Sequence, residues 1–275
     1  MFNDMASESI SHTVTILFLL FMFLAPFKSK AQVLLHDMIL DGELPSSLWN
    51  FCSDAAGISG NIFAFGLFVS PIPTFRRIMR NQSTEQFSGL PYIYSFLNCL
   101  ICLWYGSPLV SPGVILVATV NSIGAVFQFI YITIFILYAE RSKKLKMTGL
   151  LLAVIAIFAV VAFVSIKVLD MSARQTFVGF LSVASLISMF ASPLFIIKLV
   201  IKTKSVEFMP FYLSLSTFLM SLSFSAYGFS KYDPFIYVPN VIGTILGVVQ
   251  LALYYYISRT SREDSREPLI NTYVV

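Results

Sequence analysis

Phe68-Val69-Ser70-Pro71 and Phe190-Ala191-Ser192-Pro193 are two copies of one short pattern, about 120 residues apart in apolar sequence. A glycine precedes each copy at the same distance, Gly57 in the first and Gly179 in the second. Further matched pairs follow each copy: Ser83-Thr84-Glu85 with Ser205-Val206-Glu207, Tyr105-Gly106 with Tyr227-Gly228, and Asn121-Ser122-Ile123-Gly124 with Asn240-Val241-Ile242-Gly243. The repeat unit is therefore a set of membrane helices. Two similar halves in a membrane place a natural ligand site at the seam between them.

The composition is that of a chain surrounded mostly by lipid. Of its 275 residues, 57% are hydrophobic and only 12% are charged, about half the charge of a soluble domain. Spanning the hydrocarbon core takes about 20 apolar residues per helix. Seven blocks of that kind lie at roughly 55–75, 90–106, 112–138, 147–169, 177–197, 209–229 and 235–257. Because backbone groups in lipid must be satisfied within each segment, we expect an all-α integral membrane fold with seven transmembrane helices.

Basic residues gather in alternate loops and so indicate the orientation of the chain. One set of loops and the tail carry most of them: Arg76, Arg77, Arg80, Arg141, Lys143, Lys144, Lys146, Lys198, Lys202, Lys204, Arg259, Arg262 and Arg266. The opposite loops hold only Lys167, Arg174 and Lys231. The positive-inside rule then predicts a cytosolic C-terminus and a non-cytosolic start of the first span. This pattern explains the charge better than a nucleic-acid partner, which would need one basic groove-sized face.

The matched pairs divide the chain into two three-helix repeats joined by a linker helix. We expect the first repeat at 52–140, the linker at 147–169 and the second repeat at 177–257. The second copy starts four helices after the first. Because four crossings return the chain to the same side of the membrane, both copies begin on the same side. The repeats are therefore predicted to be parallel, in a 3+1+3 arrangement, and related by an axis along the membrane normal.

Both ends of the chain lie outside the repeat. Residues 1–50 contain an apolar stretch of about fifteen residues (13–27) and both histidines, His12 and His36. They predict either a leader or an over-long gene model with a later start such as Met38. The tail, 258–275, is polar and expected to be disordered. Its Asp264 precedes the pair Leu269-Ile270, which is similar to the acidic dileucine signals of plant vacuolar-membrane proteins or is simply a solvated tail.

The sequence offers no constellation for catalysis or metal binding. Every acidic residue lies in the leader, a loop, a helix end or the tail, and no histidine follows position 36. The cysteines (Cys52, Cys99 and Cys102) are interpreted as small apolar helix residues, not a disulfide framework. A hydrolase, a metalloenzyme or a proton-coupled carrier would need titratable groups at depth. We therefore expect no enzyme and no cofactor, but downhill movement of a neutral solute.

Two asparagines are the polar groups that stand out at depth. Asn121 and Asn240 occupy matched positions in the third helix of each copy. An amide offers two donors and two acceptor lone pairs, which suits the binding of hydroxyls. A single membrane asparagine more often holds helices together, contributing about 1 kcal/mol. Two at symmetry-related positions favour a binding site in which they face each other.

Prolines mark the first two helices of each copy as matched pairs. Pro71 matches Pro193 and Pro91 matches Pro210, all near the basic side. Proline removes a helical hydrogen bond and clashes with the preceding turn, so the four are candidates for hinges around a cytosolic gate. The alternative is the ordinary frequency of proline in membrane helices. Glycines 106, 124, 228 and 243 are interpreted as sites of close helix packing.

These features together resemble the SWEET sugar facilitators. The resemblance rests on Ser-Pro in the first helix, Ser83-Thr84-Glu85-Gln86-Phe87-Ser88 and Pro91 before the second, Asn-x-x-Gly in the third, and the run from Lys202 to Phe211. It covers about residues 52–257. It looks most like the plant clade whose members sit on the vacuolar membrane and carry hexoses. SWEET proteins are themselves an established example of parallel repeats.

The resemblance implies roles for particular residues. Sugar contacts carry over to Asn121 and Asn240, with Cys102 at the position of a pocket Ser or Cys, and Phe224 where many members have Trp. The four prolines match the family's proline tetrad. Tyr105 and Asp233 match a gate on the non-cytosolic side. The loop Ser111-Pro112-Gly113 lacks the charge that members often place there, so Tyr105 becomes the expected partner of Asp233.

The resulting prediction is a bidirectional, uncoupled uniporter for a monosaccharide, glucose first, working by alternating access. The expected partners are the sugar, membrane lipid and, as an option, a homo-oligomer or a hetero-oligomer with related transporters. The vacuolar membrane is the favoured location and the plasma membrane the alternative. Two other classes stay open at this point: a seven-helix receptor and a membrane protein that transports nothing. Internal symmetry and a matched polar centre would separate a transporter from both.

Overall fold

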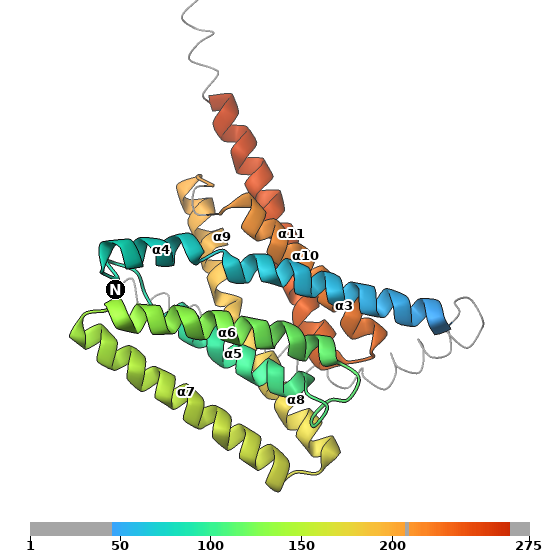
Figure 1. The fold of residues 1–275 in the computed structure, drawn as a ribbon. Coiled ribbons are helices and arrows are strands. Elements are labelled where there is room, and N and C mark those ends of the chain that lie inside the picture. Colours follow the sequence, from blue (N-terminus) through green and yellow to red (C-terminus); the bar gives the residue numbers. More distant parts are fainter. Residues whose placement is uncertain (1–45, 207–208, 265–275) are drawn as a thin grey trace, which may run out of the picture.

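All regular structure in the described part of the chain is α-helical (Figure 1). A computed structural model describes residues 46–206 and 209–264. The predicted leader segment 13–27, His12 and His36 fall outside these residues, as does the Leu269-Ile270 pair. The helices are α3 (Ser46–Val69), α4 (Ile72–Asn81), α5 (Leu90–Gly106), α6 (Ile115–Tyr138), α7 (Arg141–Lys167), α8 (Met171–Met189), α9 (Ala191–Thr203), α10 (Phe211–Ser230) and α11 (Pro234–Asp264).

These helices form seven spans, because α3 continues into α4 and α8 into α9. Five spans of the described residues are long and apolar enough to cross a membrane by themselves: 48–81, 115–138, 141–167, 171–203 and 234–260. The other two, α5 and α10, are the second helix of each repeat. The helix α5 has only 17 residues, and α10 carries several serines. The predicted all-α fold of two three-helix bundles joined by a linker helix is confirmed.

The break between α3 and α4 is built by the Ser-Pro pair. Pro71 has no N–H to donate to the carbonyl of Leu67, one turn earlier. The hydroxyl of Ser70 donates to that carbonyl instead, at 2.8 Å. The neighbouring carbonyl of Phe68 accepts a hydrogen bond from the Tyr131 hydroxyl of α6, at 2.7 Å. The chain can therefore bend here without leaving backbone acceptors unsatisfied.

The repeat extends to the details of the backbone. Gln82, the residue that follows α4, has φ 50° and ψ 30°, and Lys204, the residue that follows α9, has φ 49° and ψ 32°. Both residues are in the left-handed conformation that commonly stops a helix, although neither is glycine. Their agreement shows that the first span of each half ends with the same backbone conformation.

Glycines permit close packing within each half, as predicted. A side chain on Gly106 of α5 would lie 2.5 Å from the backbone nitrogen of Ala118 in α6. Its repeat partner Gly228 of α10 would meet the backbone nitrogen of Tyr237 in α11 at 2.6 Å. Because a backbone atom cannot move aside as a side chain can, these two contacts require glycine.

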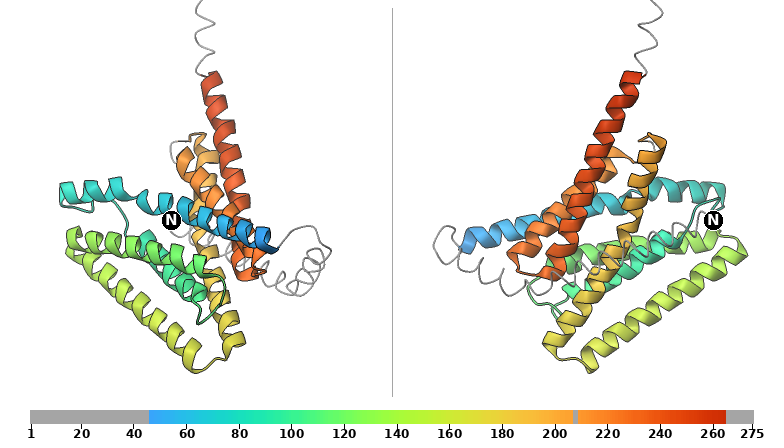
Figure 2. Two further views of the ribbon diagram at one scale, coloured as in Figure 1. Left: turned by 45° about the vertical axis from the view of Figure 1, so that its right-hand side comes forward. Right: turned by 180° about the vertical axis from the view of Figure 1, so that it is seen from behind.

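The halves meet along two helix pairs and diverge toward one end. The helix α3 packs on α10, and α5 packs on α8. Figures 1 and 2 show the loops α5–α6, α7–α8 and α10–α11 gathered at one end, which we call the opposite end. The α4–α5 and α6–α7 turns of the first half touch each other, because Lys143 Nζ donates to the carbonyl of Glu85 at 2.8 Å. The end of α9 stands apart from these two turns in Figures 1 and 2, and we call this side of the molecule, which carries most of the basic residues, the basic end.

The linker α7 lies on the outside of the first half. It packs along α5 and α6 in both views (Figures 1 and 2). Large apolar side chains such as Leu152 and Phe163 are exposed on it, as expected for a surface that faces lipid. The indole N–H of Trp104 donates to Ser165 Oγ at 2.9 Å and ties α7 to α5. The linker therefore joins the halves without lining the space between them.

Candidate functional site

A cavity of about 250 Å³ lies at the seam between the two halves. Its walls come from α3, α5 and α6 of the first half and from α8, α10 and α11 of the second. Among the described residues that line it, none carries a charge. Pockets for drug-sized ligands occupy roughly 300–1,000 Å³. The volume and lining therefore suit a small neutral ligand.

The structure brings Asn121 and Asn240 into this one cavity. Asn121 Nδ2 donates to the carbonyl of Val117 at 2.8 Å, and Asn240 Nδ2 donates to the carbonyl of Ile236 at 2.7 Å. Each amide is thus tied to its own helix, one turn back, through its nitrogen. The carbonyl oxygen of each amide is left to accept from a ligand. Their role in binding stays a prediction, but the matched residues share one geometry.

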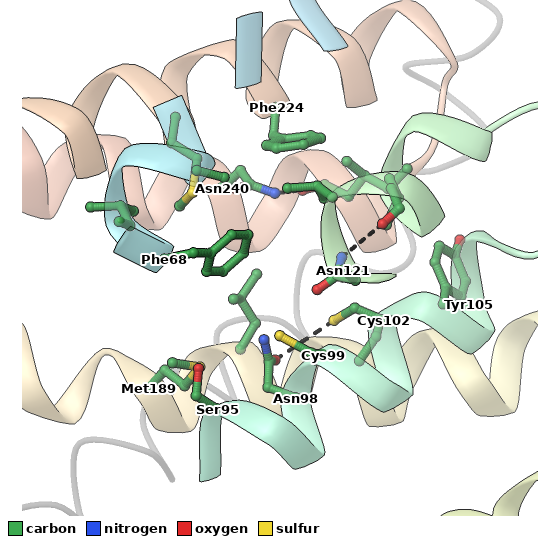
Figure 3. Close-up of a pocket in the computed structure, with 18 of the residues that line it drawn as sticks. Phe68, Ser95, Asn98, Cys99, Cys102, Tyr105, Asn121, Met189, Phe224 and Asn240 are labelled. Atoms are coloured by element: carbon green, nitrogen blue, oxygen red, sulfur yellow. Dashed lines mark hydrogen bonds between the residues drawn. The ribbon is translucent and has the colours of Figure 1, made fainter. Parts of the chain in front are cut away.

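Phe224 and Cys102 occupy equivalent places in the two halves, as the register of Tyr105 and Tyr227 shows. Both are buried and both line the cavity. The ring of Phe224 packs on Gly60 of α3, where an added side chain would come within 2.7 Å of it. One half therefore contributes a flat apolar surface where the other contributes a thiol (Figure 3).

Tyr105 and Asp233 close the cavity at the opposite end. The Tyr105 hydroxyl lies 2.6 and 2.8 Å from the two carboxylate oxygens of Asp233 and donates to them. The backbone N–H of Phe235 also donates to this carboxylate, at 3.0 Å. The expected pairing of Tyr105 with Asp233 is present, and its function as a gate remains a prediction.

Other polar contacts between the halves surround this closure. Ser230 Oγ donates to Ser53 Oγ at 2.6 Å, and Gln175 Nε2 donates to Ser111 Oγ at 3.0 Å. Ser230 ends α10 and Ser111 lies in the α5–α6 loop, so both contacts belong to the opposite end. The opposite end is therefore closed by a layer of hydrogen bonds.

The four prolines occupy two different structural positions. Pro71 stands at the break between α3 and α4, and Pro193 lies in the first turn of α9, just after α8 ends. Pro91 is in the first turn of α5, and Pro210 is the N-cap of α10. At a helix start proline removes no helical hydrogen bond. The expected loss of a helical bond therefore does not occur at Pro91 or Pro210, and their part in hinge motion stays a prediction.

Two polar residues that line the cavity, Asn98 and Gln128, were not predicted from the sequence. Asn98 on α5 is 7% exposed and contacts Ser185 on α8, where it accepts from Ser185 Oγ at 2.8 Å. Gln128 on α6 is buried, and its Oε1 has no hydrogen-bond partner in the described part of the chain. The signal was available, because Asn98 and Gln128 are uncharged amides inside predicted spans. They were missed because neither has an amide at the matched position of the other repeat.

The comparisons with known proteins agree with this arrangement. A family profile described as a sugar efflux transporter for intercellular exchange matches residues 54–143 and 176–262. The two matches correspond to the two repeats and leave out most of the linker.

Individual relatives cover most of the chain. The bidirectional sugar transporter SWEET2 of Arabidopsis thaliana is 64% identical over 226 residues, 82% of this chain and 96% of that protein. SWEET2a of Sorghum bicolor is 62% identical over 83% of this chain and 94% of that protein. A solved structure of a eukaryotic SWEET transporter superposes with a TM-score of 0.76 at 59% identity, covering 77% of this chain and 99% of that one.

Proposed function

The chain belongs to the SWEET family of sugar transporters, and on that premise we propose that it carries glucose across a membrane in both directions without ion coupling. It is a transporter and not an enzyme. The observation that supports the neutral substrate is the small seam cavity lined by amides and apolar side chains. Amides bind hydroxyls without charge, and exchanging bonds with water leaves a modest net gain that permits release.

The proposed mechanism is alternating access between the two halves. The opposite end is closed by Tyr105 and Asp233, while at the basic end the end of α9 stands apart from the α4–α5 and α6–α7 turns of the first half (Figure 2). This arrangement supports a state that faces the basic end, which the positive-inside rule predicts to be cytosolic. Rocking of the halves would exchange this closure for one at the basic end. A receptor or a purely structural membrane protein would need neither the internal symmetry nor the polar centre.

The sugar is proposed to lie between Asn121 and Asn240, with Phe224 against one face of the ring. The buried ring of Phe224 limits the cavity on the side of α10. A planar aromatic surface suits the apolar face of a pyranose, while the two amide oxygens accept from its hydroxyls. The limited volume favours a monosaccharide over a disaccharide.

Alanine substitution of the matched asparagines tests this assignment. Asn121→Ala and Asn240→Ala each remove one acceptor, and we expect each to weaken glucose uptake by roughly 2- to 12-fold, the range for one neutral hydrogen bond. Uptake of radiolabelled glucose into proteoliposomes measures the effect. Thr133→Ala is a suitable control, since this exposed side chain bonds only to its own helix at Phe129. Wild-type rates in both asparagine variants would contradict the assignment.

We also propose the vacuolar membrane as its location, with oligomers of this chain or of related transporters as an option. The Leu269-Ile270 pair supports the location, since it follows Asp264 in the pattern of a sorting signal. A fluorescent fusion of the full chain with both residues replaced by alanine tests this idea. Unchanged arrival at the vacuolar membrane would remove the support that the tail provides.

A further inference from the structure

The seam cavity contains a third amide, Asn98, which is oriented differently from Asn121 and Asn240. Its Oδ1 accepts from Ser185 Oγ at 2.8 Å and from Cys102 Sγ at 3.6 Å. Within the described residues its Nδ2 has no protein partner, and Figure 3 shows this nitrogen turned toward the cavity. An amide whose oxygen is engaged presents its N–H groups to a ligand.

We propose that Asn98 is a sugar-contacting residue that donates an N–H group to a hydroxyl oxygen. In the same proposal Ser185 and Cys102 are positioning residues that hold the amide in this orientation. The inference rests on the proposed function, and it adds a residue to the site. Asn121 and Asn240 are tied to their helices by their nitrogens and offer oxygens. The matched pair therefore supplies acceptors, and Asn98 supplies donors.

This combination fits the chemistry of a sugar better than the matched pair alone. A hydroxyl both donates and accepts, so a cavity that only accepts would leave its oxygens unpaired once water is excluded. The opposite wall offers no equivalent donor, because Met220 takes the place of Asn98 in the register set by Tyr105 and Tyr227. Donors then come from the first half, so the sugar has one preferred orientation between two similar halves.

The environment of Asn98 permits a clean test. Ser185 Oγ also lies 3.0 Å from the carbonyl of Ser182, which can accept its proton when the amide is removed. Asn98→Ala therefore leaves the Ser185 hydroxyl with a partner. Ser185→Ala frees the amide to rotate while keeping Asn98 in place, and Ser185→Thr keeps a hydroxyl there. These three variants separate sugar contact from positioning.

The experiment is competition with radiolabelled glucose exchange in proteoliposomes, using glucose, its monodeoxy derivatives and its deoxyfluoro derivatives. In the wild-type protein we expect one deoxy sugar to bind roughly 2- to 12-fold more weakly than glucose through loss of the Asn98 bond. The fluoro sugar at that carbon, which can still accept but cannot donate, should recover part of this loss. In the Asn98→Ala variant the binding of glucose itself should weaken by a similar factor. The variant should no longer distinguish glucose from the sugar that lacks the hydroxyl at that carbon.

Control variants distinguish a direct contact between Asn98 and the sugar from a purely structural role of Asn98. Met220→Ala, at the matched position of the second half, should keep the discrimination at that carbon. Ser185→Ala should reduce it, and Ser185→Thr should restore it. The assignment of Asn98 is wrong if the protein exchanges glucose but the Asn98→Ala variant still distinguishes glucose from each derivative by the same factors as the wild type. If the fluoro sugar recovers nothing, the amide accepts instead of donating and the proposal is overturned. Absence of exchange by the wild-type protein would overturn the proposed function as well.

Discussion

At the scale of single residues, the Tyr105 hydroxyl makes the shortest bonds to a charged group across the opposite end. It bonds to both oxygens of the buried Asp233 carboxylate, at 2.6 and 2.8 Å. The repeat partner Tyr227 makes a weaker contact, with its hydroxyl 3.4 Å from the carbonyl of Gly113. Bonds to a charged acceptor contribute about 1.5–3 kcal/mol, and bonds to a neutral one about 0.5–1.5 kcal/mol. The two tyrosines therefore stabilise the closed end unequally.

Tyr105→Phe should open the opposite end. Loss of the hydroxyl leaves the Asp233 carboxylate short of a donor and shifts the ratio of closed to open states by about 10-fold or more. Cys102, which lines the cavity, reports the change in a Cys52→Ser, Cys99→Ser background. A membrane-impermeant thiol reagent added from the side of the opposite end should label it faster.

Tyr227→Phe is the matched control for this labelling. It removes the hydroxyl that contacts a neutral carbonyl, so the labelling rate should change much less. Equal labelling rates for wild type and Tyr105→Phe would show that this contact does not hold the end closed.

The residues that the sequence predicted are those that the repeat or the family pattern singled out. The structure brings Asn121 and Asn240 into one cavity and Tyr105 against Asp233. The sequence could predict both pairs, because the asparagines occupy matched positions of the repeat and the second pair follows the family pattern. Asn98 could not be ranked above an ordinary packing asparagine. Its orientation depends on Ser185, 87 residues away in another helix. A contact of that kind follows from the packing of the halves and has no local sequence signal.

At the scale of helices, the break between α3 and α4 at Ser70-Pro71 can be tested by substitution. Pro71→Ala restores an N–H that can donate to the carbonyl of Leu67, so α3 and α4 should tend to join into one continuous helix. We expect glucose binding to stay within about 3-fold of wild type and the maximal transport rate to fall by roughly 10-fold or more, if bending at this point is part of the cycle. Equilibrium binding and uptake rates measured on the same preparation separate the two effects.

Pro73→Ala is the matched control, only two residues along the chain. Pro73 lies in the first turn of α4, where its N–H would have no helical partner in any case. Its replacement should leave both binding and rate close to wild type. Equal losses of rate in the two variants would mean that the break at Pro71 has no special part in transport.

Hydrophobic blocks predicted the spans well and their ends less well. The second span, 90–106, matches α5 at both ends, because Pro91 and Gly106 limit the helix there. The first span was expected to begin near 55, yet α3 begins at Ser46. Helices continue past the apolar block where polar side chains can reach water or a partner, as Trp49 does with the carbonyl of Ser230. Apolar periodicity marks the lipid-buried part of a helix and not its full length.

At the scale of the whole molecule, the distribution of charge decides the energetics of transport. The described residues that line the cavity are uncharged. The Asp233 carboxylate accepts hydrogen bonds from Tyr105 and from the backbone N–H of Phe235 at the closed end. A proton-coupled carrier would have to load and release a proton at a group that senses the substrate. Here the candidate for such a group lies at the opposite end, against Tyr105, and not among the amides.

Glucose exchange should therefore proceed without a proton gradient. In proteoliposomes with equal pH on both sides, we expect glucose to equilibrate to the same final level as with an imposed gradient, because a uniporter cannot concentrate its substrate. Tyr105→Phe and Asp233→Asn should alter the rate of equilibration and leave this final level unchanged. Accumulation of glucose above the external concentration when the inside is made alkaline would show coupling to protons. Loss of that accumulation in Asp233→Asn would identify the carboxylate as the coupling group and contradict the uniport mechanism.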